Sequence, residues 1–175
     1  ESEYSEFLKI KPMKDKYDYL NKQTSQSLHD VARTVAIFSA FTEGVQLFAS
    51  FAILLNFPRH NKMKGMGQII TWSVRDESLH CLSMIRLFNE LIKENPEVWT
   101  TKLKDEIYQA CKIAVAQEDA FIDLAFEMGP LENLEAEEVK QYIRWIANRR
   151  LTQLNMHPLY KVDKNPLGWL DAILN

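Results

Sequence analysis

Apolar positions recur along most of this chain at three- and four-residue spacing, the spacing of amphipathic helices. The two-residue alternation typical of strands is missing, and the sequence shows no internal repeat. Helices are predicted over residues 13–22, 26–56, 67–93, 102–127 and 136–154. Proline or glycine marks the ends of the middle three, at Pro58, Asn95-Pro96 and Gly129-Pro130. The pattern predicts an all-α fold, with residues 1–11 as the tail of an earlier element and residues 155–175 irregular.

The predicted helix over residues 26–56 is unusually long for a globular protein, which favours a helical bundle. Thr24 or Ser25 suits the N-cap position before it, because a side-chain oxygen there can accept a hydrogen bond from the first turn. Gly44 lies near its middle, and glycine is a poor helix former in an interior position. We therefore expect the helix to loosen at Gly44. A polar connection over residues 59–67 leads to the next helix.

Glu43 is the only charged residue in the apolar run from Val35 to Phe57. A buried carboxylate is costly unless it is paired, protonated or bound to metal, so Glu43 needs a partner inside the protein. Two interpretations stay open. Glu43 binds a metal ion, or it lies in a plain core helix where it is protonated or hydrogen-bonded to Arg75 or a hydroxyl group.

The same run is long enough to span a membrane, since about 20 apolar residues suffice. Polar residues nevertheless cluster near its middle, at Thr42, Glu43, Gly44 and Gln46, and its flanks show no clear charge asymmetry. We therefore expect no membrane insertion.

Glu77 and His80 are three residues apart in the predicted helix over residues 67–93, so they lie on one face of it. A carboxylate and an imidazole at this spacing can bind one metal ion. One glutamate from one helix, together with Glu-x-x-His from its neighbour, is half of the ligand set of carboxylate-bridged dinuclear metal proteins. Asp76 lies four residues before His80. Spacing alone does not decide whether Asp76 is a ligand or instead orients a metal-bound histidine.

Other charged residues have plain structural interpretations. Glu118 and Asp119 lie on the predicted 102–127 helix without a histidine at matching spacing, and we expect them on a solvated or salt-bridged face. Arg149 and Arg150, near the end of the last predicted helix, suit the negative end of the helix dipole. For the two arginines, a phosphate site is the less favoured alternative.

The chain has 175 residues, enough to form a hydrophobic core, and we treat residues 1–175 as a single domain. Its net charge of −3 lacks the positive excess that is typical of nucleic-acid-binding proteins, so we expect no nucleic-acid partner. Cys81 and Cys111 have neither metal-site spacing nor the density of a disulfide-rich secreted protein. The first residues are acidic and lack the apolar core of a signal peptide. These features predict reduced thiols and a cytoplasmic protein.

Four segments occur in the order Thr42–Phe51, Arg75–His80, Ile146–Leu151 and Asn165–Trp169. In sequence they resemble the C-terminal half of the small, radical-generating subunit of class I ribonucleotide reductase, and the resemblance covers nearly the whole chain. It implies a ferritin-like helical bundle. It also implies an enzyme subunit that assembles a dinuclear metal centre, activates dioxygen and passes an oxidising equivalent to a large subunit, which reduces ribonucleotides to deoxyribonucleotides.

By position, the resemblance implies that Glu43, Glu77 and His80 are the three metal ligands of one half-site. It assigns Asp76 to the radical-transfer path, hydrogen-bonded to a histidine ligand. Leu47 matches the apolar wall of the radical pocket, as does Phe51. The implied cofactor is a dinuclear metal centre, with di-iron as the first choice and manganese–iron or di-manganese as alternatives. The implied partners are the ribonucleotide reductase large subunit and a second copy of the small subunit.

The chain departs from the family pattern at both ends. The other three metal ligands, the radical-storing tyrosine and an early relay tryptophan would lie before Glu43, and this sequence does not contain them. The tail that docks on the large subunit would follow Asn175. We therefore expect this chain to be one part of a longer protein. Two alternative functions are a related ferritin-like dinuclear metal oxidase and a metal-binding half-bundle that dimerises to complete its site.

Overall fold

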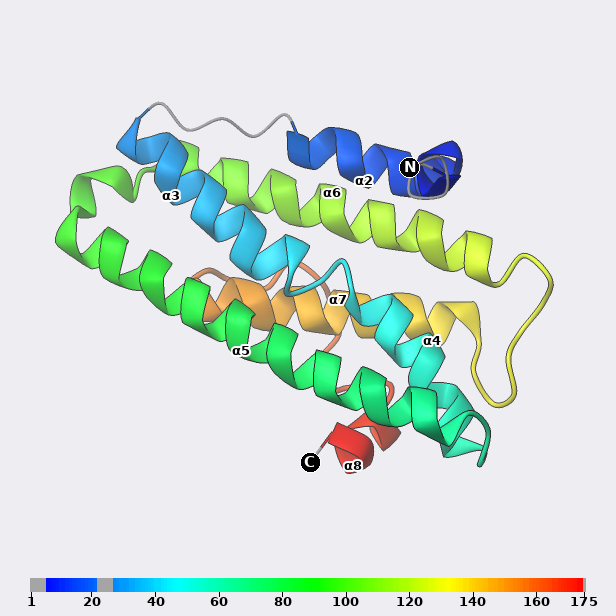
Figure 1. Ribbon diagram of the computed structural model, residues 1–175. Coiled ribbons are helices and arrows are strands. Elements are labelled where there is room, and N and C mark those ends of the chain that lie inside the picture. The colour runs from blue at the N-terminus through cyan, green and yellow to red at the C-terminus, as the bar shows by residue number, and fades with distance from the viewer. Residues whose placement is uncertain (1–5, 22–26, 175) are drawn as a thin grey trace.

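The computed structural model describes residues 6–21 and 27–174, and every regular element in these ranges is a helix (Figure 1). In chain order the elements are η1 (Glu6–Lys9), α2 (Lys11–Asn21), α3 (Leu28–Ile37), η2 (Phe38–Thr42), α4 (Phe48–Arg59), α5 (Lys64–Glu94), η3 (Pro96–Val98), α6 (Thr101–Ala125), α7 (Ala136–Gln153) and α8 (Trp169–Leu174). The segment η2 is π-helical, whereas η1 and η3 are short 3-10 helices. The predicted all-α fold is confirmed.

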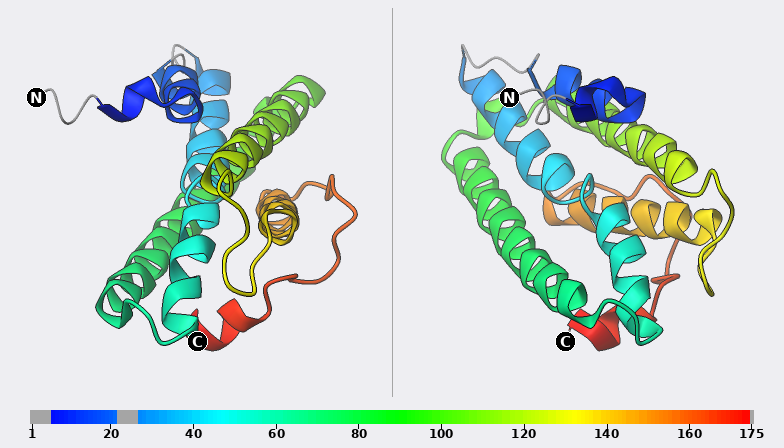
Figure 2. Two further views of the ribbon diagram at one scale, coloured as in Figure 1. Left: turned by 90° about the vertical axis from the view of Figure 1, so that its right-hand side faces the viewer. Right: turned by 45° about the vertical axis from the view of Figure 1, so that its right-hand side comes forward.

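The segment formed by α3, η2 and α4 runs through the middle of the molecule (Figures 1 and 2). Helix α3 packs on α5 and α6, and α4 packs on α5 and α7, while α2 lies against α6. Ala32, Ala36 and Ala40 are fully buried at four-residue spacing along this segment. Their small side chains allow neighbouring helices to approach closely. Glu43 follows three residues after Ala40, the last of these alanines.

Helix α3 begins at a different cap from the one predicted. The hydroxyl of Ser27 accepts a hydrogen bond from the amide of Asp30 at 3.2 Å, which satisfies a donor in the first turn. Thr24 and Ser25, the residues predicted to cap this helix, lie outside the described residues.

The prediction of one continuous helix over residues 26–56 is wrong. In η2 the hydrogen bonding widens to five residues, so that the amide of Glu43 donates to the carbonyl of Phe38 at 3.0 Å. A turn over residues 43–47 then separates η2 from α4. The loosening predicted at Gly44 is confirmed, but it is a full interruption of the helix. No helix in the described part of the chain is both long and apolar enough to cross a membrane.

The connection between α4 and α5 is shorter than the polar segment predicted over residues 59–67. Helix α4 continues past Pro58 to Arg59, because a proline in the last turn removes only one amide donor. Helix α5 already begins at Lys64. The two helices meet closely here, since a Cβ atom added at Gly67 would lie 2.6 Å from Cγ of Pro58.

A short C-terminal helix, α8, occupies part of the segment 155–175 that the pattern predicted as irregular. It packs on α5. Leu167 and Leu170 are buried there, and the guanidinium of Arg59 lies 4.7 Å from the ring centroid of Trp169. Six residues are too few for helical periodicity to be read from sequence.

A buried ion pair joins α2 to α6. Glu118 is fully buried, and its carboxylate pairs with the ammonium group of Lys16. Burial raises the pKa of Glu118 to about 7, against the opposing effects of Lys16 and the backbone amide of Ala49. Asp119 pairs instead with an arginine of α7, at 2.7 Å. The salt-bridged alternative predicted for Glu118 and Asp119 is confirmed, and the solvated one is wrong.

Replacing Glu118 with glutamine is expected to flatten the dependence of stability on pH. Because the pKa of Glu118 is raised from 4.5 to about 7 on folding, the folded state binds more protons between these values. Glu118 therefore contributes up to about 3 kcal/mol to the free energy of unfolding. This contribution is fully present below pH 4.5 and is lost as the pH rises through 7. Urea unfolding at pH 5 and pH 8 measures the difference between wild type and Glu118→Gln. If the free energy of unfolding changed equally between pH 5 and pH 8 in both proteins, the raised pKa of Glu118 would be contradicted.

Candidate metal centre

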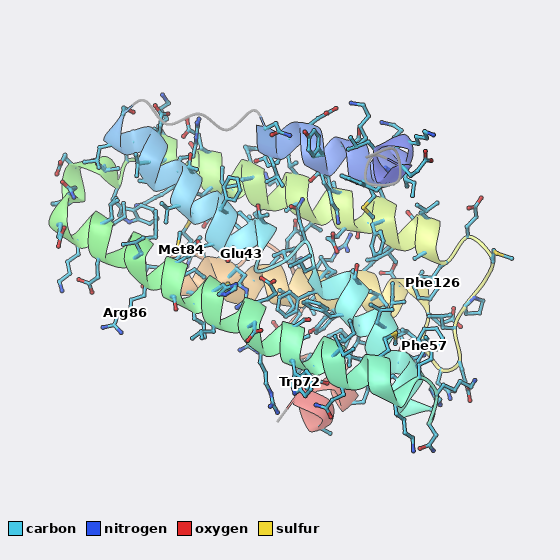
Figure 3. The ribbon with its side chains drawn as sticks, in the orientation of Figure 1. Glu43, Phe57, Trp72, Met84, Arg86 and Phe126 are labelled. Carbon is cyan, nitrogen blue, oxygen red and sulfur yellow. The ribbon has the colours of Figure 1, made fainter. Side chains whose placement is uncertain are left out.

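Three potential metal ligands come together where η2 meets α5. Glu43, Glu77 and His80 each offer one ligand atom, and these atoms all lie within 4.8 Å of one another. Glu43 directly follows η2, which packs against α5, and Figure 3 shows it beside that helix. Glu77 and His80 lie one turn apart on α5, as their spacing predicted. The structure thus brings together the residues that the sequence predicted as one half-site.

The electrostatics of this cluster favour a cation. The Oε2 atom of Glu43 is buried and has no hydrogen-bond partner in the described part of the chain. A buried carboxylate oxygen without a partner is destabilising, and a metal ion would compensate for it. The nearest oxygen of Glu77 lies 3.6 Å from Nδ1 of His80, too far for a strong hydrogen bond, so these atoms remain available. Two carboxylates and one imidazole form a donor set that suits iron or manganese.

The half-site lies at an uncovered face of α5. The side chain of Glu77 is 27% exposed and that of His80 is 59% exposed. Large apolar side chains on the same helix are exposed too, and the most exposed are Ile69, Trp72 and Leu79 (Trp72 is labelled in Figure 3). Three ligands cannot saturate two metal ions. A dinuclear centre at this position would need further ligands from polypeptide that covers this face.

Asp76 lies on α5 beside the cluster but outside it. Its side chain is exposed, and the cluster of ligand atoms found among the described residues does not include it. This placement does not support direct ligation, which is one of the two interpretations that spacing left open. Leu47 is 36% exposed in the turn after Glu43, and Phe51 packs edge to face on Phe48 with ring centroids 5.6 Å apart.

Arg150 contacts the backbone next to Glu43, a contact that no sequence pattern predicted. We expected it to interact with the dipole at the end of α7. Instead it is only 6% exposed, and its Nε donates to the carbonyl of Gly44 at 3.0 Å. Burial lowers the pKa of Arg150. Cys81, a buried free thiol one residue after His80, lies close to the same glycine. Only tertiary packing places these residues at the site.

The sequence profile of the family described as "Ribonucleotide reductase, small chain" matches residues 1–166 of this chain. The chain belongs to the ribonucleotide reductase small-chain family. Within this family, the probable ribonucleoside-diphosphate reductase small subunit 048L of Invertebrate iridescent virus 3 is 45% identical over 190 residues. That match covers 98% of this chain and 50% of the viral protein. The chain thus spans about half the length of the curated relatives it matches.

Solved structures of ribonucleotide reductase small subunits show the same fold. The R2 subunit from Clostridium botulinum superposes with a TM-score of 0.89 at 21% identity, covering 98% of this chain and 56% of the other. Streptococcus sanguinis dimanganese(II)-NrdF superposes with a TM-score of 0.78 at 23% identity, covering 94% of this chain and 56% of the other. The ferritin-like helical bundle predicted from the sequence is confirmed.

Proposed function

We propose that this chain is the C-terminal half of the radical-generating small subunit of a ribonucleoside-diphosphate reductase, and that residues 1–175 act as a single domain within it. The observation that carries the proposal is the meeting of Glu43, Glu77 and His80, with a buried unpartnered oxygen on Glu43, in a chain of this family. The subunit supplies the radical with which a large subunit reduces ribonucleotides to deoxyribonucleotides.

Glu43, Glu77 and His80 would hold one side of a dinuclear metal centre. When bound, such a centre would supply the electrons that activate dioxygen, and the oxidising equivalent that results would serve to generate the radical. Di-iron is our first choice, and manganese–iron and di-manganese are the alternatives, since carboxylates and imidazole suit both metals. The relative from Streptococcus sanguinis is described as a dimanganese(II) protein. Within the cluster, Glu43 contributes a carboxylate with one buried oxygen, and the turn of α5 between Glu77 and His80 fixes their separation.

We expect the rest of the subunit to pack on the uncovered face of α5. Exposed apolar side chains beside the half-site would be buried by polypeptide outside residues 1–175, which would also bring the remaining ligands. Asp76, exposed on this helix, would connect the metal centre to the radical-transfer path. We further propose a homodimeric small subunit that works with the large subunit in the cytoplasm, where the buried thiols Cys81 and Cys111 remain reduced.

Replacing either α5 ligand with alanine in the full-length protein is expected to abolish the dinuclear centre. Glu77→Ala and His80→Ala each remove a donor from a cluster that has no spare ligand, so metal content should fall from about two ions per chain to below about one. Glu90→Ala is a matched control, because Glu90 lies on the same helix and pairs only at the surface with Lys93.

Elemental analysis of the purified proteins gives the metal content. If Glu77→Ala and His80→Ala retain as much metal as Glu90→Ala, these residues are not ligands and the proposed function loses its support. A protein that binds two ions per dimer without any further polypeptide would instead support the half-bundle alternative. A complete centre that does not support nucleotide reduction with the large subunit would support a related oxidase.

A further inference from the structure

The interruption of the central helix after Glu43 leaves backbone carbonyl groups in the protein interior. In a continuous helix, each carbonyl accepts the amide four residues later, and a break removes some of these partners. Within the turn over residues 43–47, the carbonyls of Val45 and Leu47 accept hydrogen bonds from amides in the first turn of α4, at 3.0 and 3.1 Å. The carbonyls of Gly44 and Gln46 are bonded instead by positively charged side chains from other helices.

Arg150 of α7 holds the first of these carbonyls. Its Nε donates to Gly44 at 3.0 Å, and its Nη1 donates to Gln153 at 3.1 Å. The guanidinium also lies 5.3 Å from the ring centroid of Phe48. No ion pair with a carboxylate is found for Arg150 among the described residues. A buried cation is costly, yet its shortest hydrogen bond goes to the backbone of the residue that follows Glu43.

The contact between Arg150 and the turn is tight. A Cβ atom added at Gly44 would lie 2.7 Å from Nε of Arg150 and 2.9 Å from Sγ of Cys81. The glycine backbone is therefore pressed between α7 and α5. The peptide unit bonded by Arg150 joins Gly44 to Val45, one unit away from the Cα atom of Glu43, so that a shift of this unit would be transmitted to Glu43 through Gly44.

Lys16 of α2 holds the other end of the turn. Its Nζ lies 3.3 Å from the carbonyl oxygen of Gln46 and pairs with buried Glu118. The side chain of Gln46 donates to Gln117 of α6 at 2.6 Å. The start of α4 is thus fixed from α2 and α6.

We propose that Arg150 and Lys16 are positioning residues, which hold the two ends of the turn over residues 43–47 and so fix the Glu43 carboxylate for metal binding. This inference rests on the proposed role of Glu43 as a ligand. Hydrogen bonds from charged donors are stronger than those from neutral groups, especially away from water. Two such bonds allow a turn without regular helical bonding to present its ligand in one position.

The experiment compares variants of the full-length protein that remove each contact. Arg150→Met removes the first cation, and Arg150→Lys keeps a cation that can reach the same carbonyl. Lys16→Met with Glu118→Gln removes both charges of the second pair together, so that no unpaired charge remains buried. Arg149→Met is the matched control, because Arg149 is the exposed neighbour of Arg150 and lies over the ring of Trp145. Glu43→Ala tests the ligand itself.

Two measurements are made on each variant. Hydrogen exchange of the metal-free protein reports the protection of the amides of residues 43–48, and Mn²⁺ titration followed by electron paramagnetic resonance reports binding. We expect about tenfold faster exchange in this segment and about tenfold weaker Mn²⁺ binding for Arg150→Met and for the Lys16/Glu118 double variant. Arg150→Lys should recover part of both losses, and Arg149→Met should match wild type.

The outcomes separate the two proposals. Unchanged exchange or unchanged Mn²⁺ binding in the Arg150 and Lys16 variants, together with lost binding in Glu43→Ala, overturns the positioning role and leaves the proposed function intact. Full Mn²⁺ binding by Glu43→Ala overturns the proposed function itself. If Arg150→Met does not fold, the Lys16/Glu118 double variant decides: exchange and Mn²⁺ binding equal to wild type in that variant would overturn the positioning role.

Discussion

Asp76→Asn in the full-length protein is expected to keep the metal centre and to lose nucleotide reduction by about a hundredfold. Asp76 is exposed on α5, and its carboxylate is not among the ligand atoms that lie within 4.8 Å of one another. Metal binding should therefore survive the substitution. Asparagine has nearly the same shape but carries no charge, so it is a poorer acceptor for a histidine that is bound to metal.

The separation of the two effects is the test of this role. Metal content by elemental analysis and turnover with the large subunit are measured on the same preparation, with Asp105→Asn as a control at an exposed position of α6. Metal loss as severe as that of His80→Ala would make Asp76 a ligand or an essential part of the scaffold. Turnover equal to that of Asp105→Asn would show that Asp76 has no part in radical transfer in this protein.

Gly44→Ala is expected to destabilise the protein by about 3 kcal/mol, a large effect for the addition of one methyl group. The added Cβ would lie 2.3 Å from the carbonyl oxygen of Ala40, as well as 2.7 Å from Arg150 and 2.9 Å from Cys81. The first of these atoms belongs to the backbone of η2 and cannot move unless the π-helical segment changes. The clash would also displace Glu43.

Gly65→Ala is the matched control for this prediction. Gly65 lies near the start of α5, and a Cβ atom added there would meet nothing within 4 Å. Alanine is the better helix former, so this variant is expected to be as stable as wild type or more stable by up to about 1 kcal/mol. Urea or thermal unfolding of both variants measures the difference. Equal stability of Gly44→Ala and Gly65→Ala would mean that the turn after Glu43 is not closely packed.

The helical fold and the candidate ligands could be predicted from sequence, because both depend on local spacing. Apolar residues at three- and four-residue intervals predict amphipathic helices wherever these pack. The three-residue spacing of Glu77 and His80 places them on one face of any helix that contains them. Glu43 stood out as a single charge in an apolar run, and burial of such a charge requires a partner regardless of the surrounding fold.

Only the tertiary structure decided three features: the break in the helix at residues 43–47, the cationic side chains that donate to the carbonyls of this turn, and the uncovered face of α5. The apolar pattern is present on both sides of residues 43–47, and helix propensity could suggest a weak point at Gly44 but not a turn. Arg150 is 106 positions from Gly44 in sequence, and Glu118 is 102 positions from Lys16. Whether such charges lie in solvent or bond a buried carbonyl depends on which helices pack together, and local sequence does not contain that information.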